Sequence, residues 1–291
     1  MFLPRGYDIY LSETIFVIPT LSKVLGRVPK YSKIVNLMAD PILYNIKMGR
    51  PNRIPNKILR FLAGKVDAYV SVGPWKSLLR DLGINVPVIE IVSGVEDKLY
   101  DRLLKQSNKT FNHDIIFIGN LTPSRAEYKG LDIIFEGLDL VRKKYSDARL
   151  IISGQSQLSE EHTGIEYTGF VRDIAKELRK VSLAVNMGRG DTFPVGTIES
   201  MLAGVPTIVS NQTGTKIIAD KADKSFVVDL NSNKLASKII EYFKMSDKEK
   251  IALQKKFKKA ALPYKRSLVI ADFKGKWEDL VRTLGKKGPN A

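Results

Sequence analysis

GRGDTFPVGTIESMLAGVPTIVSNQTG, residues 188–214, is the stretch of the chain that decides the fold. An apolar run ends at Asn186 just before it, a glycine-rich loop opens it, and a helical pattern starts at 196–197. The turn at 203–206 leads into the β-branched run 206–210. A strand, loop, helix and strand in this order predict one βα unit of a parallel sheet. Backbone N–H groups and the positive end of the helix then lie at the carboxyl edge of the sheet, where phosphates bind readily.

Two carboxylates flank the junction of loop and helix. Asp191 lies in the loop, and Glu199 lies within the first helical turns. Because a carboxylate can accept hydrogen bonds from two sugar or ribose hydroxyls, a spaced pair can hold both ends of a nucleotide sugar. The same spacing also fits a structural role, in which Asp191 caps the turn and Glu199 favours the helix N-terminus. Spacing alone does not decide between the two roles.

Short β-branched runs alternate with longer amphipathic stretches on both sides of this unit, which is typical of α/β proteins with parallel sheets. In the second part of the chain we predict strands at 114–119, 149–153, 165–168, 183–186, 206–210 and 225–228 and helices at 130–144, 173–180 and 197–203, with helices again from Asn233 and a break near Pro263. In the first part we predict strands at 8–11, 33–37, 68–71 and 88–91 and helices at 55–63 and 74–82.

The polar, charged segment 101–112 precedes the strand at 114–119 and marks a domain boundary. We therefore predict two Rossmann-like domains, 1–108 and 109–291. The first is small for an independent unit of this type. The terminal helix around Trp277 is expected to return to it.

The composition excludes several kinds of chemistry. The chain has 291 residues, enough for two modest domains, no cysteine and only two histidines, His113 and His162. Disulfides, a thiol nucleophile and Cys- or His-based metal clusters are therefore not expected. The formal net charge of +16 favours anionic partners: nucleotide diphosphates, acidic lipid headgroups or nucleic acid. It also fits a Lys-rich surface kept for solubility or heat tolerance.

The sequence also bears on location. No run reaches the ~18 apolar residues that span a bilayer. The start, MFLPRGYDIYL, lacks the apolar run and cleavage site of a signal peptide. We expect a cytoplasmic protein, with association at the inner face of a membrane as a further option. Nucleic acid is not an expected partner, because no segment matches a zinc finger, an RNA-recognition motif or a basic zipper.

The neighbours of Asp191 and Glu199 resemble the signature of the family 4 glycosyltransferases of the GT-B superfamily. Asp191 stands where that family has its first Glu, Phe193 stands at its Phe, and Glu199 stands at its second Glu. The segment 200–206 (SMLAGVP) follows in register, and Gly214 falls in the later glycine turn. The resemblance implies a GT-B fold, in which two Rossmann-like domains face a cleft, here with a reduced N-terminal domain.

Further stretches agree with this family. IGNL at 118–121 with Lys129-Gly130 is similar to the element after the first strand of the donor domain, and YTGFV at 167–171 resembles the segment that borders the nucleobase. ISG at 152–154 and SGV at 93–95 also match. The resemblance covers residues 65–220 well and both ends of the chain loosely.

The resemblance implies a role for individual residues. Lys129 contacts the donor diphosphate, Asp191 binds sugar hydroxyls and Glu199 binds the ribose. The predicted donor-binding set is Gly119, Asn120, Arg125, Lys129, Gly169, Phe170, Val171, Asp191, Phe193, Val195, Gly196, Thr197 and Glu199. The implied reaction retains the anomeric configuration and needs no metal or other cofactor. The departing phosphate oxygen itself helps to deprotonate the acceptor.

The sequence departs from the family in the donor half. Asn120 stands where an Arg is usual, and Arg125 in the following loop is the candidate for the second positive charge, although it also fits a solvated loop position. Asp191 is one methylene shorter than the usual Glu. Pro194 replaces a usual Gly and stiffens the loop.

The N-terminal half departs further. No glycine-rich loop precedes Tyr7, and Ala39 stands where the family often has a His near the reaction centre. Asp40 beside it is a candidate catalytic residue, but an Asp before Pro41 also fits the end of a strand. Either the N-terminal domain is naturally reduced, or the true start lies upstream.

A basic segment stands apart from these motifs. Residues 23–65 hold ten Lys or Arg and one acid, Asp40. Within it, the helix predicted at 55–63 places Ile58, Leu59 and Leu62 near one face, with Phe61 adjacent. Such a helix fits an anionic membrane surface near a lipid-linked acceptor, or a core-facing helix with a solvated outer face.

These observations favour a retaining hexosyltransferase that uses a nucleotide-diphosphate sugar and a glycan or lipid-linked acceptor. Because the expected N-terminal loop is missing, a second hypothesis is a nucleotide-sugar-binding remnant with weak or no turnover that acts as a partner or regulatory subunit. A related GT-B enzyme, such as a sugar-nucleotide epimerase, fits the motif less well.

Overall fold

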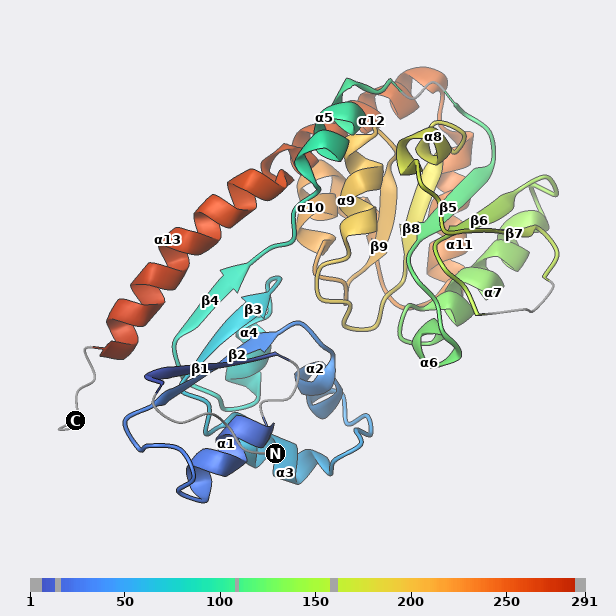
Figure 1. Cartoon of the computed structure of the whole chain (residues 1–291). Coiled ribbons are helices and arrows are strands. Elements are labelled where there is room, and N and C mark those ends of the chain that lie inside the picture. The colour runs from blue at the N-terminus through green and yellow to red at the C-terminus, as the bar shows by residue number, and fades with distance from the viewer. Residues whose placement is uncertain (1–6, 14–16, 108–109, 158–161, 286–291) are drawn as a thin grey trace. The chain divides into compact units, whose positions relative to one another are not determined.

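The computed structural model describes residues 7–13, 17–107, 110–157 and 162–285 (Figure 1). Contacts between residues divide the chain into two compact units. The first unit comprises Met1–Val92 with Val269–Ala291, and the second comprises Ser93–Leu268. The domain boundary that the sequence suggests, between residues 108 and 109, lies outside the described residues.

The first unit contains a parallel four-stranded sheet in the order β1-β2-β3-β4. Its strands are β1 (Ile9–Glu13), β2 (Lys33–Met38), β3 (Ala68–Val72) and β4 (Val88–Ile91), and its helices are α1 (Val17–Val24), α2 (Ile42–Lys47), α3 (Asn56–Ala63) and α4 (Lys76–Asp81). Alternate residues of a strand point to opposite faces, so this sheet has two apolar layers. Ile34 and Tyr69 pack with Leu59 and Leu79 on one face.

The opposite face of this sheet is covered by the end of the chain. Val35, Ala68 and Val70 pack against Leu280 and Leu284 of α13 (Arg266–Gly285). The side chain of Lys276 also donates a hydrogen bond to the Glu90 carbonyl, 2.8 Å away. The first unit is therefore assembled from two segments that are distant in the sequence.

The second unit contains a parallel six-stranded sheet in the order β10-β9-β8-β5-β6-β7. Its strands are β5 (Asp114–Ile118), β6 (Arg149–Ser153), β7 (Ile165–Gly169), β8 (Leu183–Asn186), β9 (Thr207–Ser210) and β10 (Val227–Val228). Its helices are α5 (Asp97–Lys105), α6 (Pro123–Ala126), α7 (Leu131–Arg142), α8 (Ile174–Leu178), α9 (Val195–Leu202), α10 (Lys216–Asp223), α11 (Ser232–Lys244) and α12 (Asp247–Ala261).

The strand order places a topological switch point beside β5. The chain runs from β5 outward to β6 and β7, and it then returns to β8 on the other side of β5. Loops that leave neighbouring strands in opposite directions open a crevice at the carboxyl ends of those strands, and open α/β sheets bind ligands there. In this unit the switch point lies between the loops that follow β5 and β8.

The predicted fold class is confirmed: both sheets are parallel and the chain alternates strands with helices. The strands predicted at 88–91, 149–153 and 183–186 coincide with β4, β6 and β8. The sequence analysis missed α1, α2, α5, α6 and α10. These helices are short, and α1 has Pro19 in its first turn, so their patterns carry little helical signal.

Candidate donor site

The loop after β8 lies at the switch point and is tied to two other segments. The N–H of Arg189 donates to the Tyr128 carbonyl at 2.8 Å, and the N–H of Gly190 donates to the Gln212 carbonyl at 3.1 Å. The Gly214 N–H donates to the Asp191 carbonyl, also at 2.8 Å. The loops after β5, β8 and β9 thus form one hydrogen-bonded surface at the carboxyl edge of the sheet.

Lys129 and Asp191 meet on this surface. Lys129 Nζ lies 2.7 Å from Asp191 Oδ2, and the two side chains are only 18% and 8% exposed. Tyr128 braces the pair: its hydroxyl donates to the Gly190 carbonyl at 3.0 Å, and Lys129 Nζ lies 5.5 Å from the centre of its ring. A partly buried cation is therefore held beside a carboxylate where a diphosphate and a sugar could bind.

Two glycines permit this close approach of the loops. Gly130 follows Lys129 with a φ of 72°, and a Cβ there would lie 2.0 Å from the Met187 carbonyl oxygen. A Cβ at Gly214 would lie 1.6 Å from the carbonyl oxygen of Thr192. No other residue type fits either position without moving the backbone, because the obstructing atoms belong to the main chain.

Helix α9 begins at Val195, directly after the loop. Its cap residue is Pro194, and no side chain caps its first turn. Thr197 Oγ1 donates to the Pro194 carbonyl at 2.7 Å, and Ser200 Oγ donates to the Gly196 carbonyl at 2.9 Å. The positive end of the helix dipole therefore lies at the candidate site, where it favours an anion.

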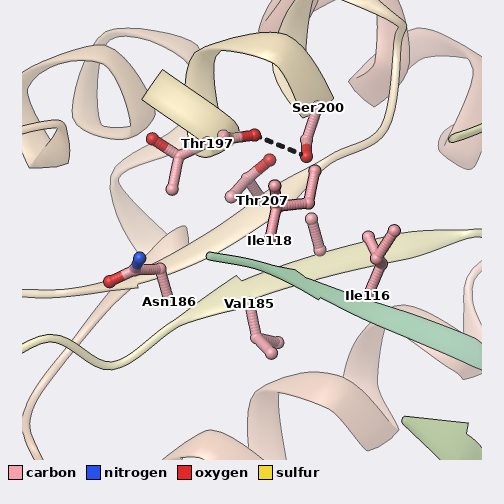
Figure 2. A pocket seen from close by; sticks show the side chains of 9 residues that line it. Ile116, Ile118, Val185, Asn186, Thr197, Ser200 and Thr207 are labelled. Atoms are coloured by element: carbon pink, nitrogen blue, oxygen red, sulfur yellow. Dashed lines mark hydrogen bonds between the residues drawn. The ribbon is translucent and has the colours of Figure 1, made fainter. Parts of the chain in front are cut away.

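Gly196 lets α9 lie directly on the sheet. A Cβ at this position would be 2.7 Å from Cβ of Ile118, the last residue of β5. Figure 2 shows the narrow space that remains beneath the helix, lined by residues that include Ile116, Asn186 and Thr207. Its empty volume is about 180 Å³, and a water-sized sphere does not fit inside it. This space is a packing gap between α9 and the sheet.

Glu199 lies one turn further along α9 and is half-buried. Burial raises its pKa to about 6, and the positive charge of Arg266 acts in the opposite direction. Arg266 is fixed by its N–H, which donates to the Val95 carbonyl at 2.9 Å. The carboxylate is therefore ionised at neutral pH but titrates close to it.

The predicted nucleobase segment lies at the same edge of the sheet. The Gly119 N–H donates to the Ser153 carbonyl and the Gly154 N–H donates to the Gly169 carbonyl, both at 2.9 Å, so the ends of β5, β6 and β7 are linked in a row. Phe170 is 71% exposed, and Val171 after it is half-buried. An exposed aromatic ring at a strand end is suited to stack on a base.

Asn120 and Arg125 are both exposed. Asn120 Oδ1 accepts a hydrogen bond from the Gln155 N–H at 3.0 Å. Arg125 lies in α6, and its carbonyl accepts the Lys129 N–H at 2.8 Å. Its guanidinium forms no ion pair within the described ranges, so its charge is available.

Two further predicted residues, Phe193 and Asp40, make structural contacts. Phe193 is 4% exposed, and its ring centre lies 5.7 Å from that of Tyr264, so it contributes to packing beneath the loop. Asp40 belongs to the first unit, where its Oδ1 accepts the Ile42 N–H at 2.9 Å at the start of α2. The observed contact of Asp40 is the structural one that its place before Pro41 allows.

The sequence analysis did not identify Tyr128, Arg189 or Arg266. Arg189 pairs with both carboxylate oxygens of Asp132, with an Nη1–Oδ1 distance of 2.7 Å, and so fixes the loop beside Lys129. Arg266 acts on Glu199 from a distant part of the chain. No local pattern marks these residues, because their partners are remote in sequence.

The described residues contain no group of three or more acidic or histidine side chains arranged to hold a metal ion. Among the helices that the structure describes, none combines the length and the apolar character that a bilayer crossing requires.

The two parallel sheets and this edge of the second sheet are those of the GT-B fold. Residues 112–245 match the family model described as glycosyl transferases group 1, and this segment holds Lys129, Asp191 and Glu199. Over this segment, which is a little under half of the chain, the protein is similar to the glycosyl transferases group 1 family.

A curated relative supports the same family. Over 82 residues the chain is 35% identical to a GDP-mannose-dependent alpha-(1-6)-phosphatidylinositol dimannoside mannosyltransferase of Mycobacterium tuberculosis. The alignment covers 25% of this chain and 22% of that protein. The matched stretch thus spans less than a quarter of the relative.

Solved structures are similar over most of the chain. Anabaena HepE in complex with UDP-glucose gives a TM-score of 0.69 at 16% identity, covering 94% of this chain and 79% of that chain. Sucrose-phosphate synthase from Thermosynechococcus elongatus gives 0.68 at 13% identity, covering 96% and 75%. A mutant of S. aureus TarM gives 0.64 at 14% identity, covering 88% and 53%. These similarities show the GT-B fold.

Proposed function

We propose that the chain is a retaining glycosyltransferase that moves a hexose from a nucleotide-diphosphate sugar to a glycan or lipid-linked acceptor. The observation that carries this proposal is the Lys129–Asp191 pair, held at 2.7 Å beside the N-terminus of α9 at the switch point of the second sheet. A cation, a carboxylate and a helix N-terminus together match the chemical groups of a nucleotide sugar.

Each group has a separate task in this proposal. Lys129 and the first N–H groups of α9 neutralise the negative charge that develops on the leaving diphosphate. Asp191 accepts hydrogen bonds from sugar hydroxyls through the lone pairs that Lys129 leaves free. Glu199 accepts hydrogen bonds from the ribose hydroxyls, and Phe170 stacks on the base. Asn120 and Arg125 border the diphosphate, with Arg125 adding a second positive charge.

The transfer itself needs no nucleophile from the protein. The bond between the sugar C1 and the diphosphate oxygen breaks, and a bond from C1 to the acceptor oxygen forms on the same face of the sugar. The acceptor proton passes to the departing phosphate oxygen. Charge stabilisation by Lys129 and α9 takes the place of a metal ion, and the protein mainly orients the groups and stabilises charge.

The names of the relatives guide the choice of donor. The mycobacterial relative is named as GDP-mannose-dependent, and HepE was crystallised with UDP-glucose. GDP-mannose and UDP-glucose are therefore the first donors to test. The relative's acceptor, a phosphatidylinositol dimannoside, supports a lipid-linked acceptor as one of the two options.

Calorimetry with GDP-, UDP-, ADP- and dTDP-sugars, without added metal, tests the donor site. We expect one nucleotide sugar to bind, and we expect Lys129→Met and Glu199→Gln each to weaken its binding at least tenfold. Lys180→Met and Glu136→Gln are matched controls, because both residues are exposed on the same unit. If the two site variants bind as tightly as the controls do, the assignment is wrong.

Release of the nucleotide separates a transferase from a binding remnant. A transferase releases nucleotide slowly in the absence of acceptor and faster with the correct one. Binding without release in the presence of glycan and lipid acceptors would favour the remnant that acts as a partner or regulatory subunit.

A further inference from the structure

Helix α1 exposes large apolar side chains on one face. Leu21 and Val24 of α1 and Leu25 directly after it stand at positions i, i+3 and i+4, and they are 43%, 52% and 56% exposed. Pro19 and Thr20 face the core instead. Residues three and four apart are neighbours on a helical surface, so these three side chains form one apolar strip at the end of the helix.

Helix α3 presents a second apolar pair. Ile58 and Phe61 are 50% and 58% exposed, whereas Leu59 and Leu62 are buried in the core of the first unit. The sequence analysis grouped Ile58 with Leu59 and Leu62, and the structure corrects this. Two large apolar residues therefore remain in water after the helix has covered the core.

Cations surround the apolar pair of α3. Lys57, Arg60 and Lys65 are exposed, and Lys65 Nζ lies 5.3 Å from the centre of the Phe61 ring. Lys57 lies one turn before Phe61 in α3, and Lys65 follows the end of the helix. None of these three cations forms an ion pair within the part of the chain that the structure describes. Residues 23–65 contain a single acid, Asp40, and two other cations of this segment, Lys23 and Lys47, pair with Asp67 and Asp81 outside it.

The two helices are neighbours. Helix α1 contacts α3, and both lie below the sheet of the first unit in the view of Figure 1. We call the exposed residues Leu21, Val24, Leu25, Lys57, Ile58, Arg60, Phe61 and Lys65 the α1–α3 surface. Exposed apolar side chains on neighbouring helices mark an interaction site more often than isolated ones do.

We propose that the α1–α3 surface docks the protein on an anionic lipid bilayer, with the apolar side chains entering the headgroup region and the cations facing acidic headgroups. Aliphatic and aromatic side chains ringed by Lys and Arg are the composition of interfacial helices. The cores of protein interfaces are instead depleted in Lys, and nucleic-acid contacts do not require exposed Leu, Ile and Val. This proposal does not depend on the donor site.

Sedimentation with phosphatidylcholine vesicles that contain 0% or about 30% phosphatidylserine tests the docking. The full chain is expected to bind only the anionic vesicles. Because one cation near such a surface contributes about 1 kcal/mol, Lys57→Gln/Lys65→Gln should weaken the partition coefficient by about 30-fold. The control Lys255→Gln/Lys256→Gln removes the same charge from exposed positions on α12 and should have a much smaller effect.

A separate variant tests the contribution of the apolar side chains of the α1–α3 surface to vesicle binding. Leu25→Ser/Phe61→Ser keeps every charge and is expected to lower vesicle binding at least tenfold, whereas Ile251→Ser, at a residue 42% exposed on α12, should not. Circular dichroism and the thermal midpoint verify that each variant is folded. Equal binding by the α1–α3 variants and their controls would overturn the proposal. The proposal would also be overturned if the protein bound duplex DNA more tightly than vesicles and the Leu25→Ser/Phe61→Ser variant bound DNA equally well. The surface would then bind nucleic acid.

Discussion

Lys129 and Asp191 are 62 positions apart in the chain, yet their side chains form an ion pair of 2.7 Å that is almost closed to solvent. Each charge is compensated by the other. A ligand that brings its own phosphates and hydroxyls can share both groups without stripping water from an isolated charge. The pair thus keeps two largely buried charges compensated within the protein.

Replacing one residue of the Lys129–Asp191 pair should show how much the stability of the protein depends on the ion pair. Lys129→Met leaves Asp191 buried without its cation, and breaking a buried pair typically lowers the free energy of unfolding by about 3–5 kcal/mol. The double variant Lys129→Met/Asp191→Leu should cost less than the sum of the two single changes. Urea unfolding measures this coupling. Lys47→Met, which breaks the exposed pair with Asp81, is the control and should cost under about 1 kcal/mol. Strict additivity at Lys129 and Asp191 would contradict the prediction.

Glu199 should give the free energy of unfolding an unusual pH dependence. Its pKa of about 6 in the folded state exceeds the ordinary value of 4.5, because burial disfavours the ionised form. Above pH 6 the raised pKa lowers the free energy of unfolding by up to about 2 kcal/mol. This loss of stability disappears as the pH falls from 6 towards 4.5. Glu199→Gln should therefore stabilise the protein at pH 8 and lose most of that advantage by pH 4.5, as urea unfolding at the two pH values would measure.

Protonation of Glu199, which stabilises the folded protein, should weaken the binding of the donor. If the ionised Glu199 accepts hydrogen bonds from the ribose, donor affinity falls as pH drops below 6. Calorimetry at pH 5, 6, 7 and 8 measures this effect. A donor affinity that does not change across this range would separate Glu199 from the binding site.

Gly130 should tolerate no side chain. In Gly130→Ala the new Cβ would meet the Met187 carbonyl oxygen at 2.0 Å, at a φ of 72° that other residues rarely adopt. The loop must move, so we expect a loss of several kcal/mol in stability and a loss of donor binding. Gly275→Ala is the matched control: it lies inside α13 with no atom within 4 Å of the new Cβ, and it should stabilise by up to about 1 kcal/mol. Thermal unfolding that ranks the two changes alike would contradict this account.

The contact of α13 with the first sheet should contribute strongly to stability. Leu280 is 3% exposed and packs against Val35, Ala68 and Val70, so Leu280→Ala should cost about 2–5 kcal/mol. Leu268→Ala, at a residue of the same helix that is 56% exposed, should change stability by less than about 0.5 kcal/mol. Hydrogen exchange of β2 and β3 amides should increase in the first variant alone.

The sheets could be predicted from the sequence because their signal is local. Strand β6, RLIIS, is a β-branched run that alternates with helical patterns, and its predicted bounds agree with the structure. It was harder to predict which apolar residues of a helix are buried when some of them face the core and others face solvent. In α3, Leu59 and Leu62 face the core while Ile58 and Phe61 face solvent, and hydrophobicity alone does not distinguish these pairs.

The candidate site was predictable only in part. Asp191 and Glu199 stand in a motif that the resemblance recognises, and Lys129 precedes a glycine that the turn requires. Their mutual geometry was not predictable, because it depends on how β5 and β8 pair. The charge of Arg266 near Glu199 arises from a chain segment after α12, and no spacing rule links the two residues.

The division of the first unit into two sequence segments has a consequence for synthesis. Strands β1–β4 leave the ribosome first, but the layer of Val35, Ala68 and Val70 gains its cover only when Leu280 and Leu284 emerge. The second unit, Ser93–Leu268, is continuous and can complete its core earlier. The first unit is therefore begun before the second unit and completed after it, and during translation its uncovered apolar layer is exposed to chaperones and to aggregation.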